Sequence, residues 1–192
     1  MRITGGTAKG RRIGFKRSFS QKDGAEELRP TSSKVREAVF DILRDRIRGS
    51  SFLDLYAGTG AVGIEALSRG AVKAVFVESS RVRARIIDSL LSRYGLEGRA
   101  VVVSARAEDF VRNGTPNGYV SDIIFLDPPY VSGEFQRVLP LIGEGHLLNS
   151  GGIVLAEHSS KMILPEGMGM LKKTRHYKYG DTALTLYRME ES

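Results

Sequence analysis

The chain contains no cysteine among its 192 residues. Disulfides and cysteine-ligated zinc are therefore excluded, and the absence of cysteine fits a reducing compartment, so we expect a cytoplasmic protein. No stretch approaches the roughly 20 consecutive apolar residues of a membrane-spanning helix. The first residues, MRITGGTAKGRR, lack the apolar core of a secretory signal. The three histidines have no metal-ligand spacing, so no metal site is expected.

Acidic residues are absent from residues 1–22, which carry seven basic residues: Arg2, Lys9, Arg11, Arg12, Lys16, Arg17 and Lys22. The rest of the chain is electrically balanced, so the whole net charge of +7 lies in this segment. Such a cluster is typical of a sequence-independent contact with phosphates. Interleaved apolar residues and the Gly5-Gly6 pair favour a basic β-hairpin over a disordered tail.

The polar stretch 20–28 reads as a linker, so we expect an extension at 1–22 and a separate domain at 23–192 whose core folds without it. A helix is predicted over 32–48, capped by Thr31 or Ser32. Strands are then predicted at 51–56, 73–78, 99–103, 121–126 and 152–157, with helices at 62–69, 81–94, 105–112 and 133–144. This alternation predicts an α/β fold: a parallel sheet with helices on both faces. A hairpin at 170–178 and 182–188 closes the chain.

A glycine-rich turn follows the first predicted strand in FLDLYAGTGAVG, residues 52–63. Gly58, Gly60 and Gly63 satisfy G-x-G-x-x-G where a strand meets a helix, and Glu78 ends the next strand, placed to accept hydrogen bonds from ribose hydroxyls. This pattern alone also fits an NAD-binding dehydrogenase. Asp54, four residues before the first glycine, favours S-adenosylmethionine instead, because an acid there can face an ammonium group.

The stretch FLDPPY ends the fourth predicted strand with an acid, two prolines and an aromatic residue. Proline fixes its own backbone and offers no N–H, so the strip presents acceptors and few donors. The Asp127 carboxylate and the Pro128 carbonyl could accept the two N–H bonds of an exocyclic amine, and Tyr130 could stack on its base. These three residues are the predicted catalytic group.

These motifs resemble, in order and spacing, class I S-adenosylmethionine-dependent methyltransferases that act on exocyclic amines. The stretches MRITGGTAKGRRI, LRPTSSKVREAVFDIL, DLYAGTGAVGIEALSRGA and YGDTALTLY are similar to the bacterial RsmD-type family. The resemblance covers nearly the whole chain. It implies a Rossmann-like seven-stranded sheet with an antiparallel last strand, and methylation of the N2 amine of a guanine in small-subunit (16S) ribosomal RNA.

The resemblance also assigns site residues. Cofactor contacts are expected from Asp54, Tyr56, Gly58, Gly60, Glu78, Arg106, Ala107 and Thr31. RNA contacts are expected from Lys9, Arg11, Arg12, Lys16, Arg17 and Arg29. Arg106 stands where such enzymes often carry an acid or amide that recognises the adenine amine; backbone groups, Glu108 or Asp109 remain alternatives for that contact.

The expected partner is 16S ribosomal RNA, naked or in a small-subunit assembly particle, bound by a monomer that has no membrane association. Two other function classes stay open. One is another DPPY-type methyltransferase, acting on adenine in DNA or on a protein glutamine. The other is a nucleic-acid-binding module that keeps the cofactor fold without catalysis.

Overall fold

The structure, a computed structural model, describes residues 2–13, 32–113, 118–129 and 133–190. Five of the predicted site residues lie outside these ranges: Lys16, Arg17, Arg29, Thr31 and Tyr130. Lys22, which belongs to the basic segment, also lies outside them.

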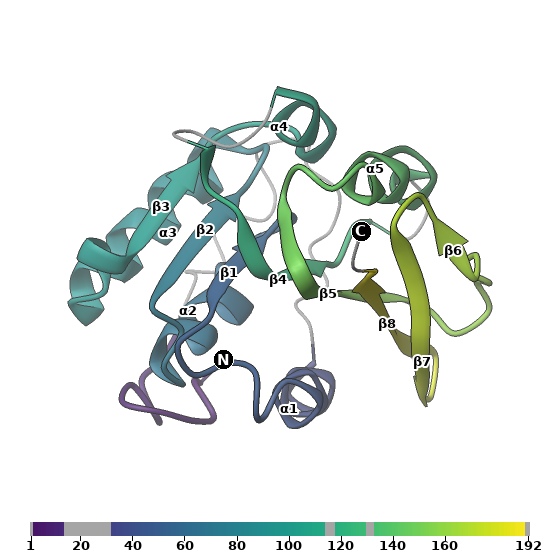
Figure 1. The fold of residues 1–192 in the computed structure, drawn as a ribbon. Helices are drawn as coiled ribbons and strands as arrows, with labels where there is room; N and C mark the ends of the chain where they lie inside the picture. The colour runs from purple at the N-terminus through teal and green to yellow at the C-terminus, as the bar shows by residue number, and fades with distance from the viewer. Residues whose placement is uncertain (1, 14–31, 114–117, 130–132, 191–192) are drawn as a thin grey trace.

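The described strands form one mixed sheet of eight strands in the order β3-β2-β1-β4-β5-β8-β7-β6 (Figure 1). Their bounds are β1 Ser51–Asp54, β2 Lys73–Val77, β3 Ala100–Val103, β4 Ser121–Leu126, β5 Leu148–Ser159, β6 Gly167–Met168, β7 Leu171–Tyr179 and β8 Thr182–Met189. Strands β1 to β5 are parallel, and β8 pairs with β5 antiparallel. The predicted α/β class and the antiparallel last strand are therefore confirmed.

Helices cover both faces of the sheet, as the strand–helix alternation predicts (Figure 1). Their bounds are α1 Ser33–Ile42, α2 Ala61–Ser68, α3 Arg81–Tyr94, α4 Ala107–Asn113 and α5 Glu134–Gly143. Successive strand residues point to opposite faces. In β4, Ile123 and Phe125 pack in the same cluster as α1, α2 and α3, whereas Ile124 and Leu126 pack with α4 and α5. Both faces of the parallel strands are thus buried.

Three elements differ from the sequence prediction by more than two residues. Strand β5 spans Leu148–Ser159 rather than 152–157. The sheet has an eighth strand, β6, which pairs with β7. Strand β6 has only two residues, so it shows no alternation of apolar and polar residues from which it could be predicted. Helix α1 ends at Ile42 rather than at residue 48. Its predicted cap is confirmed, since the Ser32 hydroxyl accepts the Val35 N–H at 3.2 Å. Leu43 and Ile47 are buried in turns, so they look helical in sequence without belonging to the helix.

The N-terminal segment is part of the core, which corrects the expectation of a separate extension. Ile3, Ala8 and Ile13 are buried in the cluster formed by α1, α2 and α3. Within residues 2–13 the chain folds back on itself through one antiparallel bridge between Arg2 and Arg12, and these residues form no two-stranded hairpin. The sequence signal was the interleaving of apolar residues with charges, which is as compatible with docking onto the domain as with an independent hairpin.

A buried ion-pair network holds this segment against the helices. Arg36 and Glu65 are almost fully buried, and Arg36 Nε lies 2.8 Å from Glu65 Oε2. Arg36 also donates to the Arg2 carbonyl at 2.6 Å, and Arg69 donates to the Thr4 hydroxyl at 3.0 Å. Buried charges need such partners to offset their lost hydration.

None of the helices in the described ranges has the length and apolar character of a membrane-spanning segment.

Candidate active site at the carboxyl edge of the sheet

Four carboxyl groups gather where the parallel strands end. Asp54 ends β1, Glu78 directly follows β2, Asp127 directly follows β4, and Glu157 lies near the end of β5. These four strands are consecutive neighbours in the sheet. Each of these acids stands two positions after a residue that packs in the hydrophobic cluster with α1, α2 and α3. The four preceding residues are Phe52, Phe76, Phe125 and Leu155. All four therefore project to the same face of the sheet at the same edge.

The glycine loop turns from β1 into α2 at this edge. Gly58 and Gly60 have φ of +53° and +72°, values that side chains other than glycine rarely adopt. A Cβ on Gly63 would lie 2.3 Å from the Phe76 ring, so this glycine permits the close packing of α2 on β2. Gly60 caps α2 without any side-chain hydrogen bond. The loop thus exposes backbone to a ligand at a helix N-terminus, which favours a negative group.

Glu78 is tied to the glycine loop and to α3. Its Oε2 accepts the Gly58 N–H at 2.8 Å. Its Oε1 accepts the Ser80 N–H at 2.8 Å and Arg83 Nε at 2.9 Å. A carboxylate has about four acceptor positions. The bonds on Oε1 fill that oxygen, and Oε2 keeps a position for one further donor, as the predicted ribose contact requires.

Asp54, at the end of β1, contacts the turn that carries the glycine motif. Its side chain is buried, and Oδ2 accepts the Gly63 N–H at 3.1 Å. Burial is the main reason that the pKa of Asp54 is raised to about 7; the nearby charges of Asp127 and Glu78 act in the same direction, and the hydrogen bond from Gly63 opposes them. A positive group near this carboxyl would favour its ionised form. The predicted contact with an ammonium group is compatible with this position and stays a prediction.

Tyr56 and the loop after β3 line the other side of this edge. The Tyr56 hydroxyl donates to Glu134 Oε2 at 2.8 Å, and burial raises the pKa of Tyr56. Arg106 is exposed, while Ala107 is buried and begins α4. Glu108, one of the alternatives for the contact with the adenine amine, is already engaged in ion pairs with Arg112 and Arg137.

The strip after β4 holds Asp127 half-buried, Pro128 buried and Pro129 exposed. Asp127 lies near enough to Asp54 and Glu157 for its charge to raise the pKa of both carboxyls. The site includes Glu157, which motif reasoning missed. The only sequence signal for Glu157 is an acid closing the apolar run GIVLAE, as Asp127 closes IIFLD.

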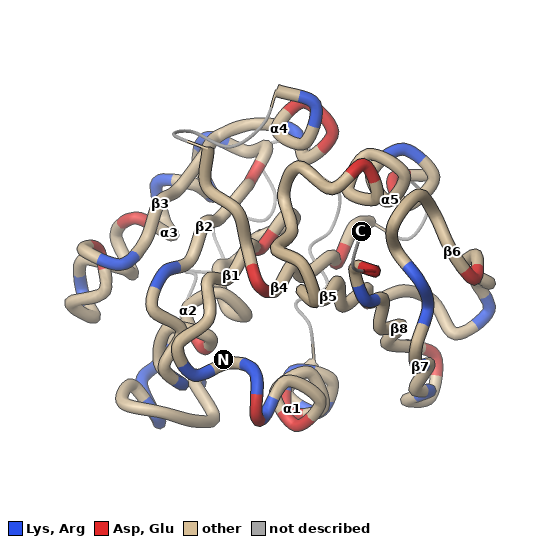
Figure 2. Tube along the Cα trace, viewed as in Figure 1, with Lys and Arg blue, Asp and Glu red and all other residues tan. Residues whose placement is uncertain are grey.

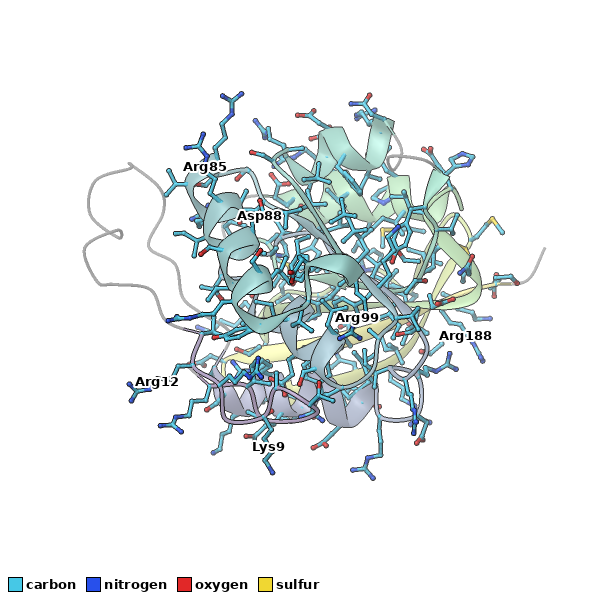
Figure 3. The ribbon with its side chains drawn as sticks, turned by 90° about the vertical axis from the view of Figure 1, so that its left-hand side faces the viewer. Lys9, Arg12, Arg85, Asp88, Arg99 and Arg188 are labelled. Atoms are coloured by element: carbon cyan, nitrogen blue, oxygen red, sulfur yellow. The ribbon has the colours of Figure 1, made fainter. Side chains whose placement is uncertain are left out.

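The described part of the basic N-terminal segment, residues 2–13, lies at the carboxyl ends of α2 and α3. Thr7 and Ala8 bond to Ser68 at the end of α2, and the Tyr94 hydroxyl at the end of α3 bonds to the Arg12 carbonyl. Helix α2 begins at the glycine loop, so its 8 residues separate the two regions by about 12 Å. Lys9 and Arg12 point outward (Figure 3), and the basic positions of the segment are marked in Figure 2.

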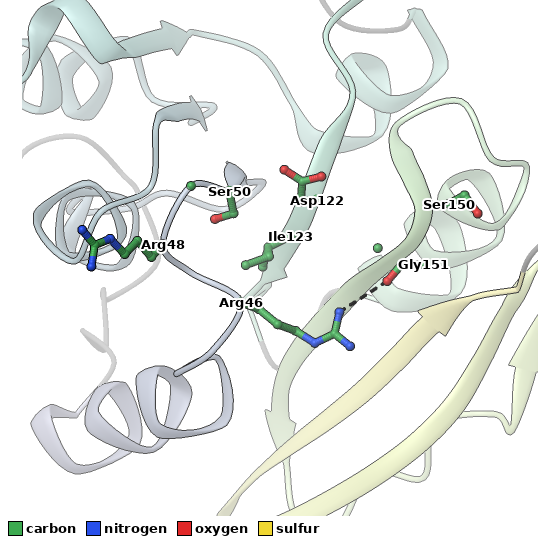
Figure 4. A pocket seen from close by; sticks show the side chains of 9 residues that line it. Arg46, Arg48, Ser50, Asp122, Ile123, Ser150 and Gly151 are labelled. Carbon is green, nitrogen blue, oxygen red and sulfur yellow. Dashed lines mark hydrogen bonds between the residues drawn. The ribbon is translucent and has the colours of Figure 1, made fainter.

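A pocket of about 330 Å³ lies at the amino ends of the strands, opposite to the candidate site (Figure 4). Its lining includes Arg46, Arg48, Ser50 and Asp122, and Arg46 donates to the Gly151 carbonyl at 3.5 Å. None of the predicted site residues lines it. Within the described ranges, no three histidine or acidic residues group as a metal site would require.

The chain is similar to known proteins over its whole length. The family described as conserved hypothetical protein 95 matches residues 1–188. The candidate rRNA methyltransferase YlbH of Bacillus subtilis (strain 168) is 34% identical over 98% of both chains. Ribosomal RNA small subunit methyltransferase D of Escherichia coli (strain K12) is 32% identical over 99% of this chain and 90% of that protein.

Solved structures agree with the fold. The candidate methyltransferase YhhF of Escherichia coli matches with a TM-score of 0.84 at 28% identity, covering 100% of this chain and 99% of that one. An RNA methyltransferase of Salinibacter ruber, in complex with S-adenosyl-L-homocysteine, shares the fold with a TM-score of 0.64 at 14% identity, over 85% of this chain and 95% of its own. The chain belongs to the conserved hypothetical protein 95 family, which confirms the RsmD-type resemblance of its motifs.

Proposed function

We propose that this protein transfers a methyl group from S-adenosylmethionine to the exocyclic N2 amine of a guanine in small-subunit ribosomal RNA. The observation that carries the proposal is the position of Asp127, which follows β4 on the same face and edge as the glycine loop and precedes two prolines. Relatives at 28–32% identity named ribosomal RNA small subunit methyltransferase D support the substrate class. The substrate is 16S RNA, naked or in an assembly particle, bound by a monomer.

The residues present fit the cofactor. Gly58 and Gly60 offer backbone without side chains, and Oε2 of Glu78 has an acceptor position for a ribose hydroxyl. Asp54 lies beneath the loop as the group facing the ammonium end, with Tyr56, Ala107 and Arg106 completing the contacts on the other side. When bound, the cofactor supplies an electrophilic methyl group on a sulfonium.

Asp127 and Pro128 act on the target amine. The lone pair of an aromatic amine is delocalised into its ring, which makes the nitrogen a poor nucleophile. Two acceptors on its N–H bonds, the Asp127 carboxylate and the Pro128 carbonyl, favour a pyramidal nitrogen whose lone pair is free to attack. As positive charge develops on nitrogen these bonds strengthen, so they stabilise the transition state more than the ground state. Asp127 then takes the surplus proton.

The RNA contact of Lys9, Arg11 and Arg12 is sequence-independent in this proposal. Their segment contacts the carboxyl end of α2, a helix about 12 Å long that begins at the glycine loop, so in this proposal they hold backbone flanking the target nucleotide rather than the target base itself. Phosphate contacts of this kind fix the register of the RNA while the carboxyl edge acts on the base. The guanidinium carbon of Arg11 also lies 5.5 Å from the centre of the Tyr94 ring, a contact that holds this side chain against α3.

The test is methylation of unmodified small-subunit ribosomal RNA with labelled cofactor, followed by digestion and mass spectrometry of the nucleosides. We expect N2-methylguanosine with the wild-type protein. Asp127→Ala should lower the rate by on the order of 100-fold or more while cofactor binding stays nearly unchanged. Label in N6-methyladenine from DNA, or in protein, would favour the alternative substrates, and wild-type turnover by Asp127→Ala would refute the role of Asp127.

A further inference from the structure

Glu157 is a buried carboxyl beside the proposed catalytic acid. Leu126 of β4 pairs in register with Ala156 of β5, so Asp127 and Glu157 are the next residues along two adjacent parallel strands. Adjacent strands lie about 4.8 Å apart. Both side chains project to the face that carries Asp54 and the glycine loop. Whatever amine Asp127 holds therefore has Glu157 as its lateral neighbour.

One carboxyl oxygen of Glu157 has no hydrogen-bond partner within the described residues. The residue is 4% exposed, and its Oε2 is the oxygen that is fully buried and unpaired. A buried polar group that is left unpaired costs about 1–3 kcal/mol. Such groups are therefore uncommon in folded proteins. An unpaired buried group at a binding edge marks a place where a ligand supplies the missing partner.

The neighbourhood of Glu157 favours the neutral carboxylic acid. The charged group acting on it is the acid Asp127, and no ion pair joins Glu157 to a described basic residue. Burial, with the charge of Asp127, raises the pKa of Glu157 to about 9. A neutral carboxylic acid offers both a donor, its O–H, and an acceptor, its carbonyl oxygen.

We propose that Glu157 recognises the guanine ring next to the target amine, donating its O–H to O6 and accepting the N1–H with its carbonyl oxygen. This inference rests on the proposed function, since it takes the amine at Asp127 to be guanine N2. The Watson–Crick edge of guanine presents N2, N1 and O6 in line, and its width is comparable to the spacing of two strands. Asp127 then holds one end of that edge and Glu157 the other.

Replacement by glutamine separates this role from that of an ionised carboxylate. The amide of Glu157→Gln still donates an N–H and accepts with its carbonyl oxygen, so it keeps both bonds to guanine. Glu157→Leu has a similar volume and offers neither bond. A general base or a countercharge would be lost in both variants, whereas a neutral recognition group is lost only in the second.

The experiment compares two bases at the guanine that the wild-type protein methylates, located first by mass spectrometry. RNA carrying guanine there is compared with RNA carrying 2-aminopurine, which keeps the C2 amine but lacks O6 and N1–H. The measured quantity is the ratio of kcat/KM for guanine over 2-aminopurine. The intrinsic reactivity of the two amines is the same for every variant, so it cancels when ratios are compared between variants.

We expect the ratio to fall by about 10-fold or more in Glu157→Leu, through slower turnover of guanine, and to stay within about 3-fold of wild type in Glu157→Gln. Glu144→Gln, at an exposed position, is the control and should not change it. Cofactor affinity and a thermal melt check folding; if Glu157→Leu does not fold, Glu157→Met takes its place.

An unchanged ratio in the folded leucine or methionine variant would overturn the inference, as would a glutamine variant as impaired on guanine as the leucine one. Either result leaves the proposed function intact, because the wild type would still form N2-methylguanosine. Absence of N2-methylguanosine from the wild-type reaction would instead overturn the proposed function and this inference with it.

Discussion

Glu78 Oε2 accepts a hydrogen bond of 2.8 Å from the backbone N–H of Gly58. The acid that follows strand β2 therefore fixes the glycine-rich turn that follows strand β1. The two residues are 20 positions apart in sequence and belong to adjacent parallel strands β2 and β1. The same carboxylate receives Arg83 from α3. One side chain therefore shapes the glycine loop and offers it the acceptor that a ribose needs.

Replacing Glu78 should weaken S-adenosylmethionine binding without unfolding the chain. In Glu78→Ala the ribose contact and the bond to Gly58 are lost together, and one charge-assisted hydrogen bond is worth about 1.5–3 kcal/mol. Calorimetry should give a Kd raised by roughly 10- to 150-fold. Glu97→Ala, on the exposed turn after α3, serves as the control. Equal affinity in wild type and Glu78→Ala would remove Glu78 from the cofactor site.

Neutralising Lys9, Arg11 and Arg12 to glutamine should weaken RNA binding and leave cofactor binding alone. All three side chains are exposed, and Arg11 also contacts Tyr94 through its guanidinium group, so a thermal melt of the variant checks that the segment stays packed. If all three contact phosphates, the slope of log K against log salt should flatten by about 2 to 3 units. The measurement is RNA binding at several salt concentrations.

A variant with the same loss of charge elsewhere controls for net charge. Lys161→Gln, Arg175→Gln and Lys178→Gln together remove three exposed basic groups near β5 and on β7. We expect a smaller change in the salt slope from this variant. Equal changes from both sets would mean that the RNA contact is not concentrated on residues 2–13.

Gly6→Ala should destabilise the protein more than Gly10→Ala. Both glycines have a positive φ, +77° and +84°, so both substitutions strain the backbone. A Cβ on Gly6 would lie 1.8 Å from the Ser68 carbonyl oxygen, whereas a Cβ on Gly10 meets nothing within 4 Å. We expect about 1 kcal/mol for Gly10→Ala and at least about 2 kcal/mol more for Gly6→Ala, because the segment must leave α2. Denaturant unfolding of the two variants measures the difference.

Equal losses in the two alanine variants would mean that the N-terminal segment contributes little to the folded core. Deletion of residues 1–22 would be a less specific test of the segment. Because Ile3, Ala8 and Ile13 are buried, deletion would expose core surface and confound RNA binding with stability.

Glu157 should make the stability of the protein depend on pH. Its pKa is raised to about 9 in the folded chain, against 4.5 in the unfolded one. Between these values the folded chain keeps a proton that the unfolded chain releases, so stability falls as pH rises, by at most about 1.4 kcal/mol per pH unit. Thermal melts from pH 5.5 to 8.5 should show this fall in wild type and a weaker one in Glu157→Gln. Parallel curves would mean that Glu157 is ionised in the folded protein.

Local features of the fold were predictable from the sequence alone. The boundaries of β4 and α3 follow from hydrophobic period and turn residues, as the structure confirms at Ser121–Leu126 and Arg81–Tyr94. The glycine loop and the acid–proline strip were equally readable, because the backbone conformations of glycine and proline are properties of single residues. These features sufficed for the α/β class and for an expected cofactor edge.

The contacts between residues far apart in sequence depend on how the strands and helices pack. Strand order places Glu157 beside Asp127 across 30 positions of chain, and no local period encodes that neighbour. Packing against α2 buries Ile3 and Ala8, which reverses the expectation of an independent extension, since charge counting does not show which apolar residues find a core. The same packing places the basic N-terminal segment, in its described residues 2–13, at the carboxyl end of α2, whereas the glycine loop lies at the amino end. The length of the helix separates the two.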